Sequence, residues 1–241
     1  MIQTILHCKR CLAAGPILLL VSVFGCGTRE YEQRLGGAVQ QLKQESVFAD
    51  MKPSAALSGA TVKIPNSFQS EPLTEATQIA GAPIDPRRVK PPNINIPGLQ
   101  VTYEESLVDG AGGKRSYYCY LATIDTTTQG NADPLDLMRR QAQTAFPRTT
   151  GTVEPVQCAT PQGNTNEWKR LRSTGDQEFY YVDRNNNADF RTMPGAMEFY
   201  SRQEGNTIIL IGWRIPTDGS GKGLVDIETW AKLVAGSATA P

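Results

Sequence analysis

The sequence predicts an α+β domain in which an antiparallel sheet of about six strands packs with two helices. Two observations carry this prediction. Segments that alternate apolar and polar residues follow one another from residue 99 to residue 215 with turns between them, as in hairpins and meanders. Two helical patterns, at residues 133–146 and 223–236, stand apart from these segments and are bounded by proline or glycine.

The first predicted secondary-structure element is a helix. Residues 29–50 place apolar side chains near heptad spacing with charges elsewhere, which predicts a stalk or a helix that packs on the domain. Gly36 and Gly37 each weaken such a helix by about 1 kcal/mol relative to alanine. An N-terminal helix of limited stability is therefore expected, with a coiled-coil partner as the alternative to an intramolecular contact.

A proline-rich stretch follows this helix. Residues 51–98 contain eight of the sixteen prolines, and proline is excluded from helix interiors and central strands. Most of the stretch is therefore predicted to be extended loop, with one short strand at residues 60–64. The basic residues Arg87, Arg88 and Lys90 either form a docking motif beside Pro91 or lie at a solvated loop edge.

The compact part of the domain begins with a hairpin. Residues 99–106 and 115–124 alternate as half-buried strands do, and the glycine-rich residues 109–113 make the turn between them. Asp133 then supplies an N-cap and Pro134 the first helical position, followed by apolar residues at helical spacing until Pro147. This hairpin and this helix are the best-marked elements of the chain.

Further strands complete the predicted sheet. They are expected at residues 154–159, 166–173, 177–183, 196–203 and 207–215, with a turn at 173–176 between the second and the third. The strand at 207–215 is the most continuously apolar and is predicted to be central. A helix at 223–236 closes the domain with one apolar face.

The first residues of the chain have the layout of a secretory signal. Lys9 and Arg10 precede an apolar run of 13 residues from Leu12 to Phe24, which is shorter than the ~20 residues that a membrane-spanning helix needs. The order of positive, apolar and small residues predicts a signal peptide over residues 1–25. Two other interpretations of these residues are an uncleaved membrane anchor and an ordinary secretory signal without lipid.

Gly25 directly before Cys26, with Val23 two residues before Gly25, resembles the lipobox of bacterial lipoproteins. The resemblance implies cleavage before Cys26 and a fatty-acylated (palmitate-bearing) cysteine that holds the protein to a membrane of the cell envelope. Gly27 in place of Asp implies the outer membrane over the inner one if the source is diderm, with the domain facing the periplasm or exterior. Three regions result: the signal at 1–25; the lipid anchor, helical stalk and linker at 26–59; and the domain at 60–241, with its proline-rich loop at 65–98.

Charge and histidine content exclude several functions. His7, the only histidine, lies in the segment expected to be removed, so the mature chain has no Ser-His or Cys-His nucleophile and no imidazole for zinc. Removal of the signal also takes Lys9 and Arg10 and leaves 22 basic against 24 acidic residues, which provides no basic footprint for nucleic acid. We expect a protein that is not an enzyme and does not bind nucleic acid.

Two cysteines remain in the mature domain. Cys8 and Cys11 leave with the signal and Cys26 carries the lipid, so Cys119 and Cys158 form an even pair. In an oxidising compartment two cysteines on neighbouring strands more often form a disulfide than stay free, and closing this loop would contribute ~3–4 kcal/mol. The alternative is two buried thiols in the core.

A second resemblance covers residues 60–236. It is carried by the order of the predicted elements together with Trp168-Lys169-Arg170-Leu171, Met193-Pro194-Gly195 before Glu198-Phe199-Tyr200, and Gly205 ahead of the apolar strand. This arrangement is similar to the PsbP-like fold. The resemblance implies a small module at a membrane, often lipid-anchored, that binds or stabilises a larger assembly, and it implies no catalytic residues.

Arginines and tyrosines supply the candidate ligand-binding residues. The arginines either converge on an anionic ligand or lie scattered on the surface; they are Arg170, Arg172, Arg184, Arg191, Arg202 and Arg214. The tyrosines alternate between faces, so some are expected in the core and some exposed as a binding surface; they are Tyr117, Tyr118, Tyr120, Tyr180, Tyr181 and Tyr200.

Two loops resemble cofactor motifs without completing them. Residues 183–189 offer oxygen ligands at the spacing of a calcium loop, but Ala188 replaces the required glycine and Pro194 replaces the bidentate Glu. Residues 219–223 lie where a phosphate loop would lie, but Pro216 and Gly223 stand where the Walker pattern needs glycine and a hydroxyl. A polar turn and a flexible connection are predicted, with no cofactor and no metal.

These observations favour a lipid-anchored envelope protein that acts as a non-enzymatic binding or scaffold module of a membrane-associated assembly, with a protein partner in the envelope. The alternative is a small-ligand-binding protein with a groove lined by arginine or tyrosine, with calcium as a further ligand. An exposed apolar patch would favour the first hypothesis, and a deep pocket with convergent arginines would favour the second.

Overall fold

The computed structural model describes residues 30–39, 42, 45–54, 57–71, 95–109, 111–129, 133–145, 150–217 and 227–240. The chain divides into two compact units, Met1–Val47 and Phe48–Pro241. The predicted signal peptide, Cys26, the proline-rich residues 72–94 and the glycine-rich residues 219–223 lie outside the described part of the chain. Within the described residues no helix is both long enough and apolar enough to cross a membrane.

The second unit is built on a seven-stranded sheet in which the paired strands are antiparallel, so the predicted α+β class with an antiparallel sheet is confirmed. In spatial order the strands are β3 (Gln69–Glu71), β4 (Leu99–Val108), β5 (Lys114–Asp125), β9 (Thr207–Pro216), β8 (Ala188–Glu204), β7 (Thr165–Val182) and β6 (Thr150–Ala159). The apolar strand β9 is central, as predicted. The short strand expected near residue 60 is β2 (Lys63–Pro65), which pairs with β1 (Met51–Pro53) in a separate two-stranded sheet.

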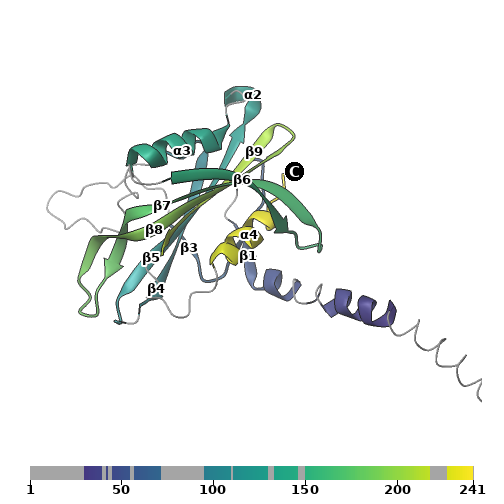
Figure 1. Ribbon diagram of the computed structural model, residues 1–241, viewed down its shortest axis with the longest axis horizontal. Coiled ribbons are helices and arrows are strands. Elements are labelled where there is room, and N and C mark those ends of the chain that lie inside the picture. The colour runs from purple at the N-terminus through teal and green to yellow at the C-terminus, as the bar shows by residue number, and fades with distance from the viewer. Residues whose placement is uncertain are drawn as a thin grey trace, which may run out of the picture. The chain divides into compact units, whose positions relative to one another are not determined.

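The prediction of two strands at 166–173 and 177–183 was wrong. These residues form one continuous strand, β7, of 18 residues, which runs beside the 17-residue β8 (Figure 1). Thr174, Gly175 and Asp176 pair with Ala196, Gly195 and Pro194 instead of turning, and Gly175 does not adopt a positive φ. The partner strand satisfies the backbone groups that a turn would have left to solvent, and this overrides the local turn preference of the sequence.

The two main helices follow the sequence signals. Helix α3 (Pro134–Ala145) begins at the predicted cap, where Asp133 Oδ1 accepts a hydrogen bond from the Leu135 amide at 3.0 Å. Helix α4 (Ile227–Ser237) occupies most of the predicted C-terminal helix. A short helix, α2 (Thr126–Gln129), directly follows β5 and was not predicted.

Helices α3 and α4 cover opposite faces of the sheet. Side chains from α3 pack with Tyr118, Tyr120 and Ala122 of β5, whereas side chains from α4 pack with the intervening Tyr117, Cys119 and Leu121. Successive residues of a strand point to opposite faces, so β5 is buried on both sides. The central strand β9 is likewise almost entirely buried, whereas β7 carries exposed residues along much of its length.

The described residues of the first unit are helical at 30–39, 42 and 45–47, in agreement with the predicted N-terminal helix. Their large apolar side chains are exposed: Tyr31 (66%), Leu35 (50%), Val39 (42%) and Leu42 (64%). By contrast Phe48 and Met51, at the start of the second unit, are buried in its core. Within the described residues of the first unit, nothing covers the apolar face of the N-terminal helix.

Candidate functional site

Two of the candidate arginines converge, but on a carboxylate of the protein itself. Arg172 Nε lies 3.4 Å from Glu198 Oε1, and Arg170 Nη1 lies 4.0 Å from Glu198 Oε2. Arg170 also donates from Nε to Glu154 Oε1 at 3.0 Å. The Glu198 side chain is 3% exposed, so its charge is compensated inside the fold. We refer to Glu154, Arg170, Arg172, Glu198 and Tyr200 as the Glu198 cluster.

Tyr200 completes the cluster from the same strand as Glu198. Its hydroxyl donates to Glu198 Oε2 at 2.9 Å, and residues 198 and 200 of β8 share one face. Burial, followed by the neighbouring negative charge of Glu198, raises the pKa of Tyr200 well above its usual range. The tyrosine therefore acts as a permanent hydrogen-bond donor to a buried carboxylate.

Of the other four candidate arginines, Arg202 and Arg214 make their contacts with residues outside this cluster. Arg202 Nη2 pairs with Glu204 Oε1 at 2.5 Å, and its guanidinium lies 5.9 Å from the centre of the Trp168 ring. Arg214 is 2% exposed and donates from Nε to Gln177 Oε1 at 3.2 Å, next to the Phe179 ring. The structure therefore brings together Arg170 and Arg172 but not Arg202 and Arg214.

The expectation that some of the six tyrosines are exposed was wrong. Tyr117, Tyr118, Tyr120, Tyr180, Tyr181 and Tyr200 are all at most 7% exposed. The reason is that both faces of the sheet are covered. Successive side chains of a strand therefore point into one hydrophobic cluster or the other, and neither set points to solvent. No row of exposed tyrosines exists among these six residues.

The expected disulfide is not formed, because Cys119 and Cys158 are both free and buried. Cys119 on β5 pairs with Trp213 of β9, and Cys158 on β6 pairs with Asn166 of β7. The two cysteines therefore do not lie on strands that pair with each other, as the prediction required. Burial raises the pKa of Cys158 to about 11, against the opposing effect of Lys232, Arg170 and Arg202, and burial also raises the pKa of Cys119.

The calcium-like loop is a hydrogen-bonded turn. Asp183 Oδ1 accepts from the amides of Asn185 and Asn187 at 2.8 Å each, and Oδ2 accepts from Asn187 Nδ2 at 3.0 Å. The Asn187 side chain and these amides lower the pKa of Asp183. Among the described residues no group of three or more His, Cys, Asp or Glu side chains is arranged to hold a metal ion.

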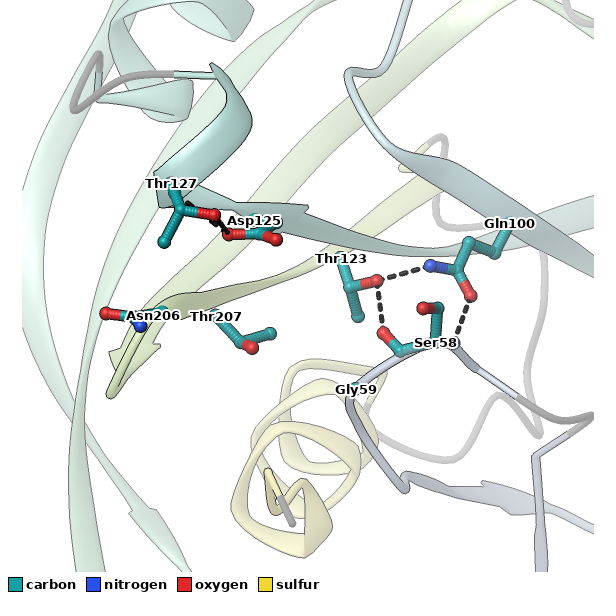
Figure 2. Close-up of a pocket in the computed structure, with 8 residues that line it drawn as sticks. All are labelled: Ser58, Gly59, Gln100, Thr123, Asp125, Thr127, Asn206 and Thr207. Atoms are coloured by element: carbon teal, nitrogen blue, oxygen red, sulfur yellow. Dashed lines mark hydrogen bonds between the residues drawn. The ribbon is translucent and has the colours of Figure 1, made fainter.

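At the start of β5, Lys114 and Arg115 also pair with Val182 and Tyr181 of β7. A pocket of about 390 Å³ lies at the other end of β5, and sequence reasoning did not single it out. All of its lining residues are polar or glycine: Ser58, Gly59, Gln100, Thr123, Asp125, Thr127, Asn206 and Thr207. They come from the β1–β2 loop, the start of β4, the end of β5, α2 and the β8–β9 turn (Figure 2). We call this site the Asp125 pocket.

One wall of the Asp125 pocket is a hydrogen-bonded triad. The Ser58 amide donates to Gln100 Oε1 at 2.6 Å, and Thr123 Oγ1 donates to the Ser58 carbonyl at 2.7 Å. Gln100 Nε2 in turn donates to Thr123 Oγ1 (Figure 2). Thr123 is 8% exposed, so this wall is fixed to the core of the sheet.

Asp125 occupies the other side of the pocket. Its Oδ1 accepts from the Thr127 amide at 2.8 Å and from Thr127 Oγ1 at 2.6 Å. These two hydrogen bonds lower the pKa of Asp125, so the carboxylate is ionised at neutral pH. The only signal that the sequence offered was the polar run Asp125-Thr126-Thr127-Thr128 at the end of an apolar strand.

No protein-family model matches the chain, and no curated protein matches it. Among solved structures it is similar to cyanobacterial PsbP (CyanoP) from Synechocystis sp. PCC 6803, at 10% identity over 80% of this chain and 94% of that chain, with a TM-score of 0.36. It is also similar to the Ran-binding protein Mog1p from Saccharomyces cerevisiae, at 10% identity over 79% of this chain and 96% of that chain, again with a TM-score of 0.36. Both similarities are distant, and neither assigns the chain to a family.

Proposed function

We propose that the protein is a non-enzymatic binding module, anchored to a cell-envelope membrane through lipid on Cys26, which docks a partner protein through its N-terminal helix. The observation that carries the proposal is the exposed apolar stripe of that helix. Tyr31, Leu35 and Val39 follow one another at intervals of four residues within the described helical run 30–39, so at 3.6 residues per turn they fall within an arc of about 80°. Leu42 is also helical and exposed. We call these four residues the helix stripe.

The exposure of the helix stripe distinguishes it from the rest of the apolar surface. Its members are 42–66% exposed. Among the other described residues the exposed large apolar side chains are Val108 and Val153, which stand on separate strands. Single exposed apolar residues are normal, but a contiguous stripe favours an interaction site.

A protein partner fits the helix stripe better than the membrane surface does. Helices that lie in a bilayer interface are rich in Lys and Arg on their polar face. Residues 30–39 contain Glu30 and Glu32 against one basic residue, Arg34. An apolar stripe with two acidic neighbours and a single basic one is better suited to the groove of a partner protein than to anionic lipid.

Site-specific photocrosslinking in native membranes tests this proposal. A photoreactive residue at Leu35 is expected to capture a defined protein, whereas the same residue at Gln33 is not. Both positions are exposed, but position 33 lies on the other side of the helix, about 160° from position 35. Capture of lipid alone, capture of a second copy of the chain alone, or equal capture from both positions would overturn the proposal.

Acylation is tested separately. Incorporation of labelled fatty acid into the wild-type chain, and its loss in Cys26→Ser, is expected because lipid on that sulfur is what anchors the protein. Retention of residues 1–25 on protein recovered from cells, or an unmodified cysteine at position 26, would contradict this part of the proposal.

A further inference from the structure

We infer that the Asp125 pocket binds a small polyhydroxylated amine, such as an amino sugar, with the ammonium group at Asp125 and hydroxyl groups at the polar side chains beside it. The inference concerns residues of the second unit and does not depend on the docking role of the helix stripe. A cavity of about 390 Å³ falls in the range of small-molecule sites and is large enough for one sugar ring.

The charge of the pocket selects the ligand class. Asp125 is the only charged residue that lines it, and its pKa is lowered by the Thr127 side chain and amide. While Oδ1 accepts both bonds from Thr127, Oδ2 accepts none from the part of the chain that the structure describes. An ionised carboxylate only accepts hydrogen bonds, so this oxygen favours a cation or a hydroxyl donor and repels an anion.

Three further side chains in the pocket are available to a ligand. Ser58 Oγ, Thr207 Oγ1 and the Asn206 side-chain amide make no hydrogen bond within the described residues, although each could donate and accept. The Asn206 backbone is nevertheless held, because its carbonyl accepts from the Thr126 amide at 2.9 Å and from Thr126 Oγ1 at 3.1 Å. The free amide therefore projects from a fixed turn.

The site is also kept open and rigid by its neighbours. Gly59 has a φ of 76°, and a Cβ at this position would lie 3.4 Å from Thr207 Oγ1. Glycine thus permits the left-handed backbone and leaves the space in front of Thr207 unfilled. Opposite Asp125, the triad of Ser58, Gln100 and Thr123 fixes its polar atoms before any ligand arrives, which reduces the entropy lost on binding.

These features together define the ligand. The lining contains no apolar side chain beyond the methyl groups of threonine and no aromatic ring. An apolar ligand would therefore leave the polar lining groups without hydrogen-bond partners. With no arginine or lysine among the lining residues, an anion would lack a partner and meet Asp125. A compact ligand with several hydroxyls and one ammonium group matches the acceptors and donors that Asp125, Asn206 and Thr207 offer.

The test is titration of the ¹⁵N-labelled full chain with glucosamine, glucose and gluconate at equal concentration and neutral pH. Saturable shifts of the amide signals of Thr127, Asn206 and Thr207 are expected, with affinities in the order glucosamine, glucose, gluconate. Asp125→Asn is expected to weaken glucosamine binding at least about tenfold, since a hydrogen bond to a charged group is lost. The affinity of this variant for glucosamine is then expected to equal its affinity for glucose. The variant side chain can still accept from Thr127.

Two further variants separate a site effect from a general one. Asp136→Asn removes an exposed carboxylate of α3 that is not among the lining residues, and it is expected to leave glucosamine binding unchanged. Thr207→Val keeps the charge and the shape and is expected to weaken glucosamine and glucose alike. The inference is overturned if none of the three compounds shifts the pocket signals, if gluconate binds as well as glucosamine, or if Asp125→Asn binds glucosamine like the wild type.

Discussion

The Glu198 cluster and the Asp125 pocket are both polar, but they differ in whether their polar groups find hydrogen-bond partners within the protein. In the cluster the buried Glu198 is bonded by Tyr200 and paired with Arg170 and Arg172, and the exposed Glu154 accepts from Arg170. In the pocket Asp125 is exposed and keeps one oxygen without a partner among the described residues. Charged groups that the fold already satisfies serve stability, whereas polar groups left open at the end of the sheet are available to a ligand.

Removal of the buried carboxylate of Glu198 is expected to have the largest effect on stability. Glu198→Ala is expected to lower the free energy of unfolding by about 3 kcal/mol, because Arg170 and Tyr200 lose a buried partner. Urea unfolding measures the effect. Asp136→Ala is the matched control, since its pair with Arg139 is exposed on both sides and is expected to be worth less than about 1 kcal/mol. Equal losses in the two variants would show that the cluster is no more structural than a surface pair.

A milder change tests the tyrosine alone. Tyr200→Phe removes the hydroxyl that donates to Glu198 at 2.9 Å, and it is expected to cost about 1.5 kcal/mol because the acceptor is charged. Tyr31→Phe is the control, because Tyr31 is 66% exposed. A variant at position 200 as stable as wild type in urea would mean that Glu198 does not need this donor.

The pocket wall is expected to contribute less. Thr123→Val removes the hydroxyl that donates to the Ser58 carbonyl at 2.7 Å and accepts from Gln100, and the expected loss is about 1 kcal/mol because solvent can reach the freed groups. Thr152→Val on the exposed edge strand β6 serves as the control. If the loss at Thr123 exceeds that of Glu198→Ala, the pocket is a structural element and the comparison fails.

The smallest effect at neutral pH is expected from the thiols. Burial raises the pKa of Cys158 from its ordinary value of 9.0, which applies in the unfolded chain, to about 11. The folded state therefore disfavours the thiolate, so this contribution to stability is fully present below pH 9.0 and is lost as the pH rises towards 11. Stability measured across this window is expected to fall less in Cys158→Ala than in the wild type.

The same thiols give a direct test of the missing disulfide. Alkylation without reductant followed by peptide mapping is expected to leave Cys119 and Cys158 unmodified in the folded protein and to modify both after unfolding in urea. Resistance of both residues to alkylation after unfolding would show a cross-link between them.

Local signals in the sequence determined several elements. Asp133 and Pro134 marked the start of α3 because a cap and a fixed φ act within one turn. The hairpin of β4 and β5 was predictable since alternation and a glycine-rich turn lie within some twenty-five residues of chain. In the same way, the predicted N-terminal helix follows from apolar spacing alone, whatever it contacts.

The tertiary structure decided what depends on partners distant in sequence. The residues at 173–176 look like a turn, but pairing with β8 keeps them extended. Spacing in the sequence did not reveal that Cys119 and Cys158 stand on strands that do not pair with each other. The Asp125 pocket gathers short polar residues from positions 58, 100, 125 and 207, none of which carries a motif. Periodicity and capping are properties of neighbours along the chain, whereas strand order and cavities arise only when distant segments pack together.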